Sequence, residues 1–582
     1  MNGEIGNSDL PVCSFGADTP PRRRGIKAGL LPILILFFAS SVAFAQVDEA
    51  RQAIDRGEMV VAVNLLSEAL AHNPTADTYL YLGIAYAGMK EYEKAEDTLQ
   101  EGSDRFNEDP RFHNELARVY RETHDDDKAR AELRHALQVD PHNSDASDML
   151  AFMDLTEGEV QTALKYWNRS GRPIIDDILH NYYLSFGSWV VRDAIAFQPT
   201  DILHYNQWKT TEARLIETRN FTNVGLEVEP TKNADHYSAI IKTATKTNSL
   251  KDFAWNALKG TPVATSYLDV WNIGNSGLNW NSNYRWDVDR RRVEGKLSIP
   301  VPIPGLLHVE ISDTWRAERW DISPNLKGTS CPQSCFDYRA NSMRLELKRI
   351  FNYRLEAGGG FSYANRFAHG TLPQLATDSR NIGKLFLETS VRVNDGVYQN
   401  RLHLEGFTAR KTIVGDFNLT GGTAELNNRI TISKDTRTYL DWAIKGGTLR
   451  GQPPVEDYFV LGMDLHPENL LRGHTAADHG RYGLGPMATD FFLGNLDLDR
   501  KIVTMPMFDN FNLPYIVIKG FGFFDIAKTW DRTRIFQPSK LLMDSGAGLR
   551  FETPANSFNV VYGKSLRDGK AVLFGYIERR LW

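Results

Sequence analysis

The sequence predicts a multidomain chain in which helical repeats come first, a small α/β module follows, and a transmembrane β-barrel of about 16 antiparallel strands occupies the C-terminal half. Residues between 48 and 170 recur at a spacing of 34. After residue 250 the apolar residues alternate with polar ones at period two. Aromatic residues reach 11%, and membrane barrels place aromatics in girdles at both interfaces. A chain of 582 residues has room for several such parts.

Composition excludes several classes of protein. The 67 Lys and Arg residues nearly balance the 73 Asp and Glu residues, giving a net charge of −6. This balance argues against a nucleic-acid-binding protein, whose affinity comes from neutralising phosphates. With 42% hydrophobic and 24% charged residues, the chain is neither disordered nor a bundle of membrane-spanning helices. The three cysteines are too few for a disulfide scaffold or a cysteine-rich zinc module.

Residues 1–45 have the features of an export signal. Basic residues over 22–24 precede an apolar run over 30–39, and Ala43 and Ala45 provide the small residues of a cleavage site. The apolar run is shorter than the ~20 residues of a spanning helix, which favours a cleaved signal over a membrane anchor. We therefore expect an exported chain in an oxidising compartment. Removal of the signal takes away Cys13 and leaves Cys331 and Cys335 in the mature chain.

Residues 46–175 are predicted to form stacked helical repeats. Small residues recur where two packed helices must touch, and large residues fill the space between them. The recurring positions are Leu82, Leu116 and Leu150, then Ala95, Ala129 and Ala163, with Tyr86 and Tyr120 between them. This pattern resembles the tetratricopeptide repeat (TPR) family. The resemblance implies a concave face for a periplasmic or lipoprotein partner; a spacer or a dimerisation surface is the alternative.

Residues 183–247 are predicted to form a β-α-β-β module. A strand is expected over 187–197, a helix over 202–219, and two strands over 225–229 and 236–244. The helix exit "ARLIETRNFTNVGLEVEP" resembles a polypeptide-transport-associated (POTRA) domain.

The POTRA resemblance implies that this module adds a client strand to an exposed sheet edge, where unpaired backbone groups provide generic affinity. The candidate residues at that edge are Val190, Leu226 and Val228. The alternative is a structural neck between the repeats and the membrane.

Residues 250–582 are predicted to form the barrel. Met343, Leu345 and Leu347 alternate with charged residues, so one face of each strand is apolar. A soluble sandwich and a membrane barrel share this pattern, but they place the apolar face differently. An exported chain with about 16 predicted strands favours the barrel over the sandwich. A membrane admits no open sheet edge, so strands that span it must close into a barrel.

Two motifs in the barrel point to a specific family. Leu471-Arg472-Gly473-His474 and the glycine-rich "GRYGLG" occur in one long connection, and Phe523-Phe524-Asp525 follows later. Together they resemble the outer-membrane assembly factor superfamily, the bacterial surface antigen family that includes barrel-assembly subunits and two-partner-secretion transporters. The motif departs from the family pattern, since Leu471 replaces valine and His474 replaces an aromatic residue.

The resemblance implies that the long connection folds into the lumen and that Arg472 meets Asp525 on the barrel wall. A guanidinium in a partly desolvated lumen needs a carboxylate partner. Strand alternation places Asn495, Asp497 and Asp499 on one face, so Asp497 is a candidate second acceptor. The alternative for Arg472 is an ordinary surface-loop arginine.

Cys331 and Cys335 are predicted to form a small disulfide in an external loop. A metal site there would need further ligands, and His308 is too distant in sequence to suggest one. Neither a nucleophile elbow, a zinc-protease pair, a Walker loop nor a dinucleotide fingerprint occurs in the sequence. We expect no enzymatic activity, no cofactor and no metal.

The predicted function is insertion or translocation of client polypeptides across the bacterial outer membrane, as the family resemblance implies. The expected partners are the client polypeptide, outer-membrane lipid and a protein bound to the repeats, with no nucleic acid. Export of a polysaccharide or another polymer is the main alternative, because repeat-plus-barrel chains also perform it. A surface receptor or adhesin is the third possibility.

Overall fold

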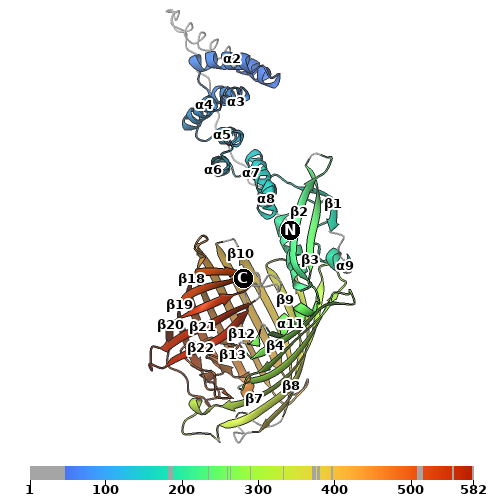
Figure 1. Ribbon diagram of the computed structural model, residues 1–582, viewed down its shortest axis with the longest axis vertical. Helices are drawn as coiled ribbons and strands as arrows, with labels where there is room; N and C mark the ends of the chain where they lie inside the picture. Colours follow the sequence, from blue (N-terminus) through green and yellow to red (C-terminus); the bar gives the residue numbers. More distant parts are fainter. Residues whose placement is uncertain are drawn as a thin grey trace, which may run out of the picture. The chain divides into compact units, whose positions relative to one another are not determined.

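The computed structural model describes most of the chain after the predicted signal (Figure 1). The described residues are 46–180, 188–233, 235–258, 260–261, 264–288, 290–331, 333–369, 375, 380–394, 397–506, 515–553 and 556–579. The predicted signal, 1–45, lies outside them. The chain divides into two compact units after Met153, and each unit is described by itself.

The N-terminal segment consists of helices. After a helix over 46–55, the helices are α2 (Met59–His72), α3 (Ala76–Gly88), α4 (Tyr92–Arg105), α5 (Arg111–Glu122), α6 (Asp126–Val139), α7 (Ser144–Thr156) and α8 (Val160–Trp167). Gly83 of α3 lies against Leu99 of α4, with no room for a Cβ atom. The hydroxyl of Thr75 caps α3 by accepting from the backbone of Thr78. The small residues that recur in the sequence are therefore helix-packing positions.

The module that follows has the order β-α-α-β-β. Its elements are β1 (Ile174–His180), α9 (Ser188–Ala194), α10 (Tyr205–Glu217), β2 (Phe221–Pro230) and β3 (His236–Thr245). The sheet order is β1-β3-β2, with β1 parallel and β2 antiparallel to β3. Helix α10 and both C-terminal strands lie where the sequence predicts them.

The predicted first strand, over 187–197, is wrong. Residues 188–194 form helix α9, and the first strand lies earlier, at 174–180. Val190, Val191 and Ala194 are fully buried, and their spacing places them on one face of a helix. The β-branched residues suggested a strand, but their burial as a helical face overrides that propensity.

The C-terminal part is a closed barrel, in which neighbouring strands run antiparallel from β4 through β13 and β18 to β22. Helix α11 (Leu250–Leu258) precedes it. The long strands are β4 (Thr265–Ile273), β5 (Leu278–Trp286), β6 (Arg290–Val301), β7 (Leu307–Asp321), β8 (Cys335–Ile350), β9 (Leu355–His369), β10 (Asn381–Asn394), β11 (Tyr398–Ala409), β12 (Leu419–Ser433), β13 (Thr438–Gly451), β18 (Asp490–Pro506), β19 (Tyr515–Trp530), β20 (Leu542–Glu552), β21 (Asn556–Ser565) and β22 (Ala571–Arg579). These fifteen strands, counted over the described residues, are close to the predicted number of about 16.

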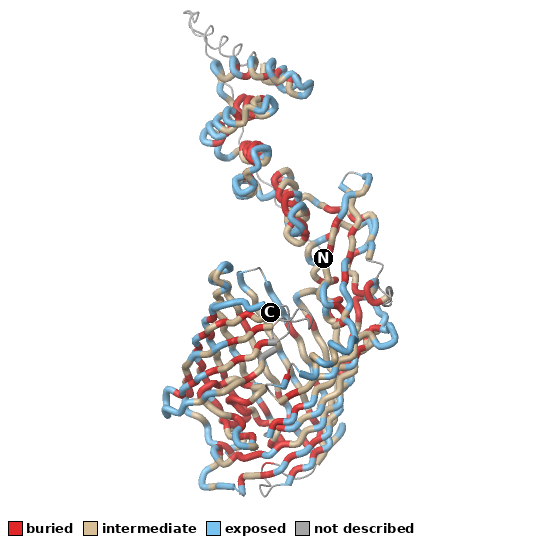
Figure 2. Tube along the Cα trace, viewed as in Figure 1, coloured by how far each residue is buried: buried red, intermediate tan, exposed pale blue. Residues whose placement is uncertain are grey.

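The apolar side chains of the wall are exposed on its outside, as the alternation predicts. Buried, intermediate and exposed residues follow one another along the strands (Figure 2). Met343, Leu345 and Leu347 on β8 are exposed on the outside. Arg344, between them, points inward and binds Glu388 of β10 at 3.0 Å. An exposed apolar exterior around a charged interior is the arrangement of a membrane barrel. Among the helices of the described residues, none is long and apolar enough to span a membrane.

The connection between β13 and β18 folds into the barrel. It carries β14 (Phe459–Val460), β15 (Ala477–Asp478), β16 (Arg481–Tyr482) and β17 (Met487–Ala488). Tyr482 pairs with Trp320 of the wall strand β7, and its ring packs edge-on against the Trp320 ring at 4.8 Å. Gly483 adopts φ 92°, a conformation that favours glycine. The connection is therefore part of the barrel interior.

Candidate functional site: an inward loop held at two walls

Arg472 lies at the tip of the inward connection and is fully buried. Its Nε donates to Asp525 Oδ2 at 2.9 Å, and its Nη2 donates to Asp525 Oδ1 at 2.5 Å. The same Nη2 lies 2.6 Å from Asp497 Oδ1. The ring of Phe523 lies beneath the guanidinium, 3.8 Å from its carbon. The structure thus brings together Arg472, Asp525 and Asp497, because only paired charges are tolerated at such burial.

The residues next to Arg472 are held by a third carboxylate. The backbone N–H of Gly473 donates to Asp544 Oδ2 at 2.6 Å, and His474 Nδ1 lies 3.1 Å from the same oxygen. A Cβ atom on Gly473 would collide with the Asp544 carboxyl group. Leu471 packs in a buried apolar cluster with Leu461. All four residues of the predicted motif therefore lie inside the barrel.

Asp544 was missed by the sequence analysis. It lies on β20 directly opposite Asp525 of β19, so both carboxylates share the inner face. The alternation within "LLMDSGAGLRF" was the available signal, since Asp544 interrupts an apolar stretch at an inward position.

A second anchor holds the same connection to a different part of the wall, strands β5 and β6. Asp464 Oδ2 accepts from Arg290 Nη1 at 3.0 Å and lies 3.6 Å from Arg285 Nη2. Glu468 Oε1 accepts from Arg290 Nη2 at 3.3 Å. Arg290 also donates to Glu318 at 3.1 Å. Here the loop provides carboxylates and the wall strands β5 and β6 provide guanidinium groups.

Consecutive loop residues also touch the last and the first strands of the barrel. The backbone N–H of Ile577 on β22 donates to the Leu465 carbonyl at 3.2 Å. The ring nitrogen Nε2 of His466 lies 3.2 Å from the hydroxyl of Thr265 on β4. Strands β22 and β4 are the neighbours that close the ring. We name residues 464–474 the strap, because they bridge the wall on both sides of this closure.

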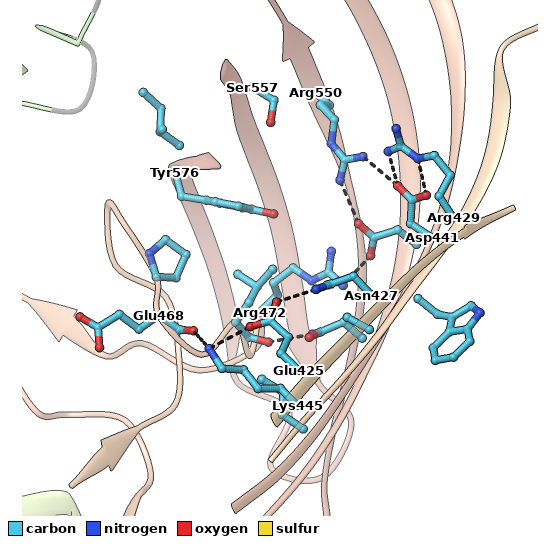
Figure 3. Close-up of a pocket in the computed structure, with 18 of the residues that line it drawn as sticks. Glu425, Asn427, Arg429, Asp441, Lys445, Glu468, Arg472, Arg550, Ser557 and Tyr576 are labelled. Atoms are coloured by element: carbon cyan, nitrogen blue, oxygen red, sulfur yellow. Dashed lines mark hydrogen bonds and ion pairs between the residues drawn. The ribbon is translucent and has the colours of Figure 1, made fainter. Parts of the chain in front are cut away.

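A cavity lined by charged side chains adjoins the strap (Figure 3). Arg429 binds Asp441 at 2.6 Å on its wall. Lys445 reaches from β13 to the carbonyl of Glu468 in the strap at 2.8 Å. Charged walls that face an enclosed space are typical of a hydrated lumen.

Asp497 is shared between the strap and the wall. Besides Arg472, it binds Arg550 Nη2 of β20 at 3.0 Å. Arg550 in turn binds Asp499 at 2.8 Å, and its guanidinium lies over the Phe521 ring. The carboxylate therefore keeps one cationic partner if the strap leaves.

The β-α-α-β-β module contacts the turns of the barrel wall. Asn220 Nδ2 donates to the Gly277 carbonyl at 3.1 Å, and Asn279 Nδ2 donates to the Thr218 carbonyl at 2.7 Å. Lys348 of β8 binds Glu217 at 3.0 Å. Burial raises the pKa of the Glu217 carboxyl, but the Lys348 ammonium outweighs it, so the pKa lies below its ordinary value.

The predicted client-binding residues do not lie together on an exposed edge. Val190 is buried in helix α9, so its assignment to a strand edge is wrong. Leu226 and Val228 do lie on β2, an edge strand of the module. Their side chains, however, point into the core. The backbone of β2, rather than these side chains, is what the sheet edge offers.

Cys331 and Cys335 form a disulfide in the connection between β7 and β8. Over the residues that the structure describes, no group of three or more His, Cys, Asp and Glu side chains could hold a metal ion.

Comparison with known proteins supports the helical repeats. The family model of the tetratricopeptide repeat matches residues 53–119. A search of the curated proteins finds no match.

Several solved structures resemble the chain, among them two of CdiB and one of BamA. CdiB from Escherichia coli has 11% identity and a TM-score of 0.49 over 70% of this chain and 76% of that chain. CdiB from Acinetobacter baumannii has 11% identity and a TM-score of 0.48 over 72% and 80%. BamA from Haemophilus ducreyi lacking POTRA domains 1-3 has 10% identity and a TM-score of 0.44 over 69% and 84%.

Proposed function

We propose that this chain is an outer-membrane barrel that inserts or translocates client polypeptides, and that the strap gates their passage. The observation that carries the proposal is the strap itself. Residues 464–474 are held inside the barrel by buried ion pairs to β18–β19 on one side and to β5–β6 on the other.

A barrel filled by its own loop is poorly suited to passive diffusion. The strap is held by side-chain charge pairs and hydrogen bonds, which can be exchanged for others without refolding the wall. Asp497 and Arg290 each retain a wall partner, Arg550 and Glu318 respectively, if the strap moves. These two wall residues therefore stay paired in both states, whereas Asp525 would keep only its hydrogen bond from the Asn495 amide.

Client recognition is assigned to backbone pairing. A polypeptide entering lipid must satisfy every backbone group, since each unpaired one costs several kcal/mol. Strand β2 belongs to the β-α-α-β-β module, which we call the neck, and lies at an edge of its sheet. Such edges accept an added strand with little sequence demand. The repeats, placed in the periplasm, would recruit a further protein partner.

The second candidate is export of a hydrated polymer such as a polysaccharide. The charged cavity beside the strap favours it, because Arg429, Asp441 and Lys445 offer hydrogen-bonding groups to a polar chain. This candidate gives no role to the edge of β2. The two proposals therefore differ in what contacts the neck. No catalytic step is proposed in either case.

The test is photo-crosslinking in intact cells, with the crosslinking residue at Asn223, an exposed position on β2. Ile216, exposed on α10, is the matched control. The proposal predicts protein adducts at Asn223 and fewer at Ile216, in a chain that fractionates with the outer membrane. An absence of protein adducts at Asn223, with carbohydrate copurifying with the chain, would favour the polymer exporter. Equal adducts at both positions would contradict recognition by the strand edge.

A further inference from the structure

Helix α11 lies beside the edge of β4 that faces away from β5. The carbonyl of Ala264 accepts from the backbone N–H of Trp286 on β5 at 2.9 Å. Successive residues of a strand direct their backbone groups to opposite sides, so the N–H of Thr265 points away from β5. The carbonyl of Gly260, just after α11, accepts that N–H at 3.0 Å.

The segment before α11 meets the other end of the same edge. The side-chain amide of Asn248 donates to the Trp271 carbonyl at 2.7 Å and accepts from the Trp271 N–H at 2.8 Å. One side chain thus bonds both backbone groups of this residue, as a neighbouring strand would. The ammonium of Lys246 lies 3.8 Å from the centre of the Trp271 ring. Residues 248–260 therefore follow β4 along the edge on which the barrel closes.

The uncovered side of α11 is mostly apolar. None of its residues is buried, and Leu250 and Leu258 are 85% and 61% exposed. The partly covered side carries Asp252, Phe253, Trp255 and Asn256. The exposed residues are Leu250, Lys251, Ala254, Ala257 and Leu258, which share one side of the helix. A helix packed on a soluble protein turns its apolar side to the protein.

The helix lies on the outer side of the wall. The hydroxyl of Ser266 donates to the carbonyl of Ala257 at 2.8 Å. Ser266 shares the face of β4 that carries Leu268, which is 50% exposed. Opposite Ser266 on β5 is Tyr284, an exposed aromatic residue of the outer face. The apolar side of α11 is therefore continuous with the apolar exterior of the barrel.

We propose that α11 is part of the membrane-facing wall and contacts the acyl chains of the bilayer leaflet on the neck side. This rests on the proposed membrane location of the barrel. A helix satisfies its own backbone, so it can face hydrocarbon where an unpaired strand could not. Nine residues span about 14 Å, roughly one leaflet of a ~30 Å hydrocarbon core.

The position of α11 along β4 selects the leaflet. Asn248 meets β4 at Trp271, close to the turn between β4 and β5. In that turn, the carbonyl of Gly277 accepts from Asn220 of the neck. The helix thus starts at the neck end of the wall.

The experiment is spin labelling of the full mature chain in phospholipid liposomes. Ala254→Cys carries the label on the exposed side of α11, and Leu258→Cys is a second site on that side. Leu387→Cys, on the exterior of β10, serves as the lipid reference, and Asp104→Cys, exposed on α4, as the water reference. The disulfide between Cys331 and Cys335 keeps the resident thiols from reacting.

The measured quantity is the ratio of oxygen to nickel-chelate collision rates. At Ala254 and Leu258 the ratio is expected to rise from the value at Asp104 to the value at Leu387. A ratio at both α11 sites that matches Asp104, or shielding from both reagents, would overturn the inference while leaving the barrel proposal intact. If Leu387 itself gives the water value, the membrane location fails and this inference fails with it.

Discussion

The two anchors of the strap have opposite polarity. At the tip, the loop provides the cation, Arg472, and the wall provides carboxylates. At the base, the loop provides the carboxylate of Asp464 and the wall provides Arg285 and Arg290. A loop shifted or reversed in the lumen would place like charges together, which costs several kcal/mol at low dielectric. Charge pattern, rather than contact area alone, thus fixes how the strap lies.

The largest loss of stability is expected for a variant at the tip of the strap, Arg472→Ala. Arg472→Ala leaves Asp525 without its cation and Asp497 with only Arg550. Breaking a buried pair in this way costs about 3–5 kcal/mol. The measurement is the free energy of unfolding in detergent micelles by denaturant titration.

The matched control for the tip is Arg319→Ala. Arg319 pairs with Asp337 while both side chains are 77% and 69% exposed, so its loss should change the free energy of unfolding by about 0–1 kcal/mol. Equal losses for Arg472→Ala and Arg319→Ala would show that the tip anchor is an ordinary surface contact.

At the base, a smaller loss is expected. Asp464→Asn keeps the size of the side chain but removes its charge, and Arg290 still has Glu318 and Glu468 as partners. We expect a loss of about 2–3 kcal/mol in the same titration. A loss as large as that of Arg472→Ala would mean that the two anchors are equivalent.

The double variant Arg472→Ala/Asp464→Asn tests whether the anchors act as one unit. If the strap detaches as a whole once either end is lost, the double variant loses less stability than the two single losses added together. The shortfall should fall within about 0.5–3 kcal/mol, the usual range for coupled sites. Strict additivity would indicate two independent contacts.

The smallest change in stability is expected at the neck, where Glu217 pairs with Lys348. Because the pKa of Glu217 is lowered in the folded chain, its stabilising pair with Lys348 is present above pH ~4.5 and is lost as the pH falls through the lowered pKa. The melting temperature of Glu217→Gln should therefore lie below that of the wild type at neutral pH and approach it in acid. A gap that stays constant with pH would contradict this role of the charge.

The tip of the strap could be predicted from the sequence, but the base could not. Arg472 and Gly473 form a short motif, the family resemblance implied that Arg472 meets Asp525, and strand alternation indicated Asp497 as a second acceptor. Asp464 and Arg290 are 174 residues apart in the chain. Nothing local to either residue indicates the other, because only the closure of the barrel places β5 and β6 beside the loop.

The same difference between local and long-range signals explains which elements of the fold were predicted correctly. Period-two alternation predicted the barrel wall, since each strand's burial repeats locally. The segment over 187–197 was assigned to a strand from its composition, whereas Val190, Val191 and Ala194 are buried together on one face of helix α9. Likewise α11 was not predicted, because the exterior of the wall beside it is not indicated by the local sequence.

The most direct test of the account is to lock the strap to the last strand. The carbonyl of Leu465 accepts from the Ile577 N–H at 3.2 Å, so the two residues are backbone neighbours, and Leu465→Cys/Ile577→Cys can be joined by a short reducible crosslinker with two thiol-reactive ends. The gating proposal predicts that client insertion or secretion stops in the crosslinked variant and returns on reduction, while Leu465→Cys alone and the wild type under the same treatment stay active. Full activity with the strap locked would contradict it.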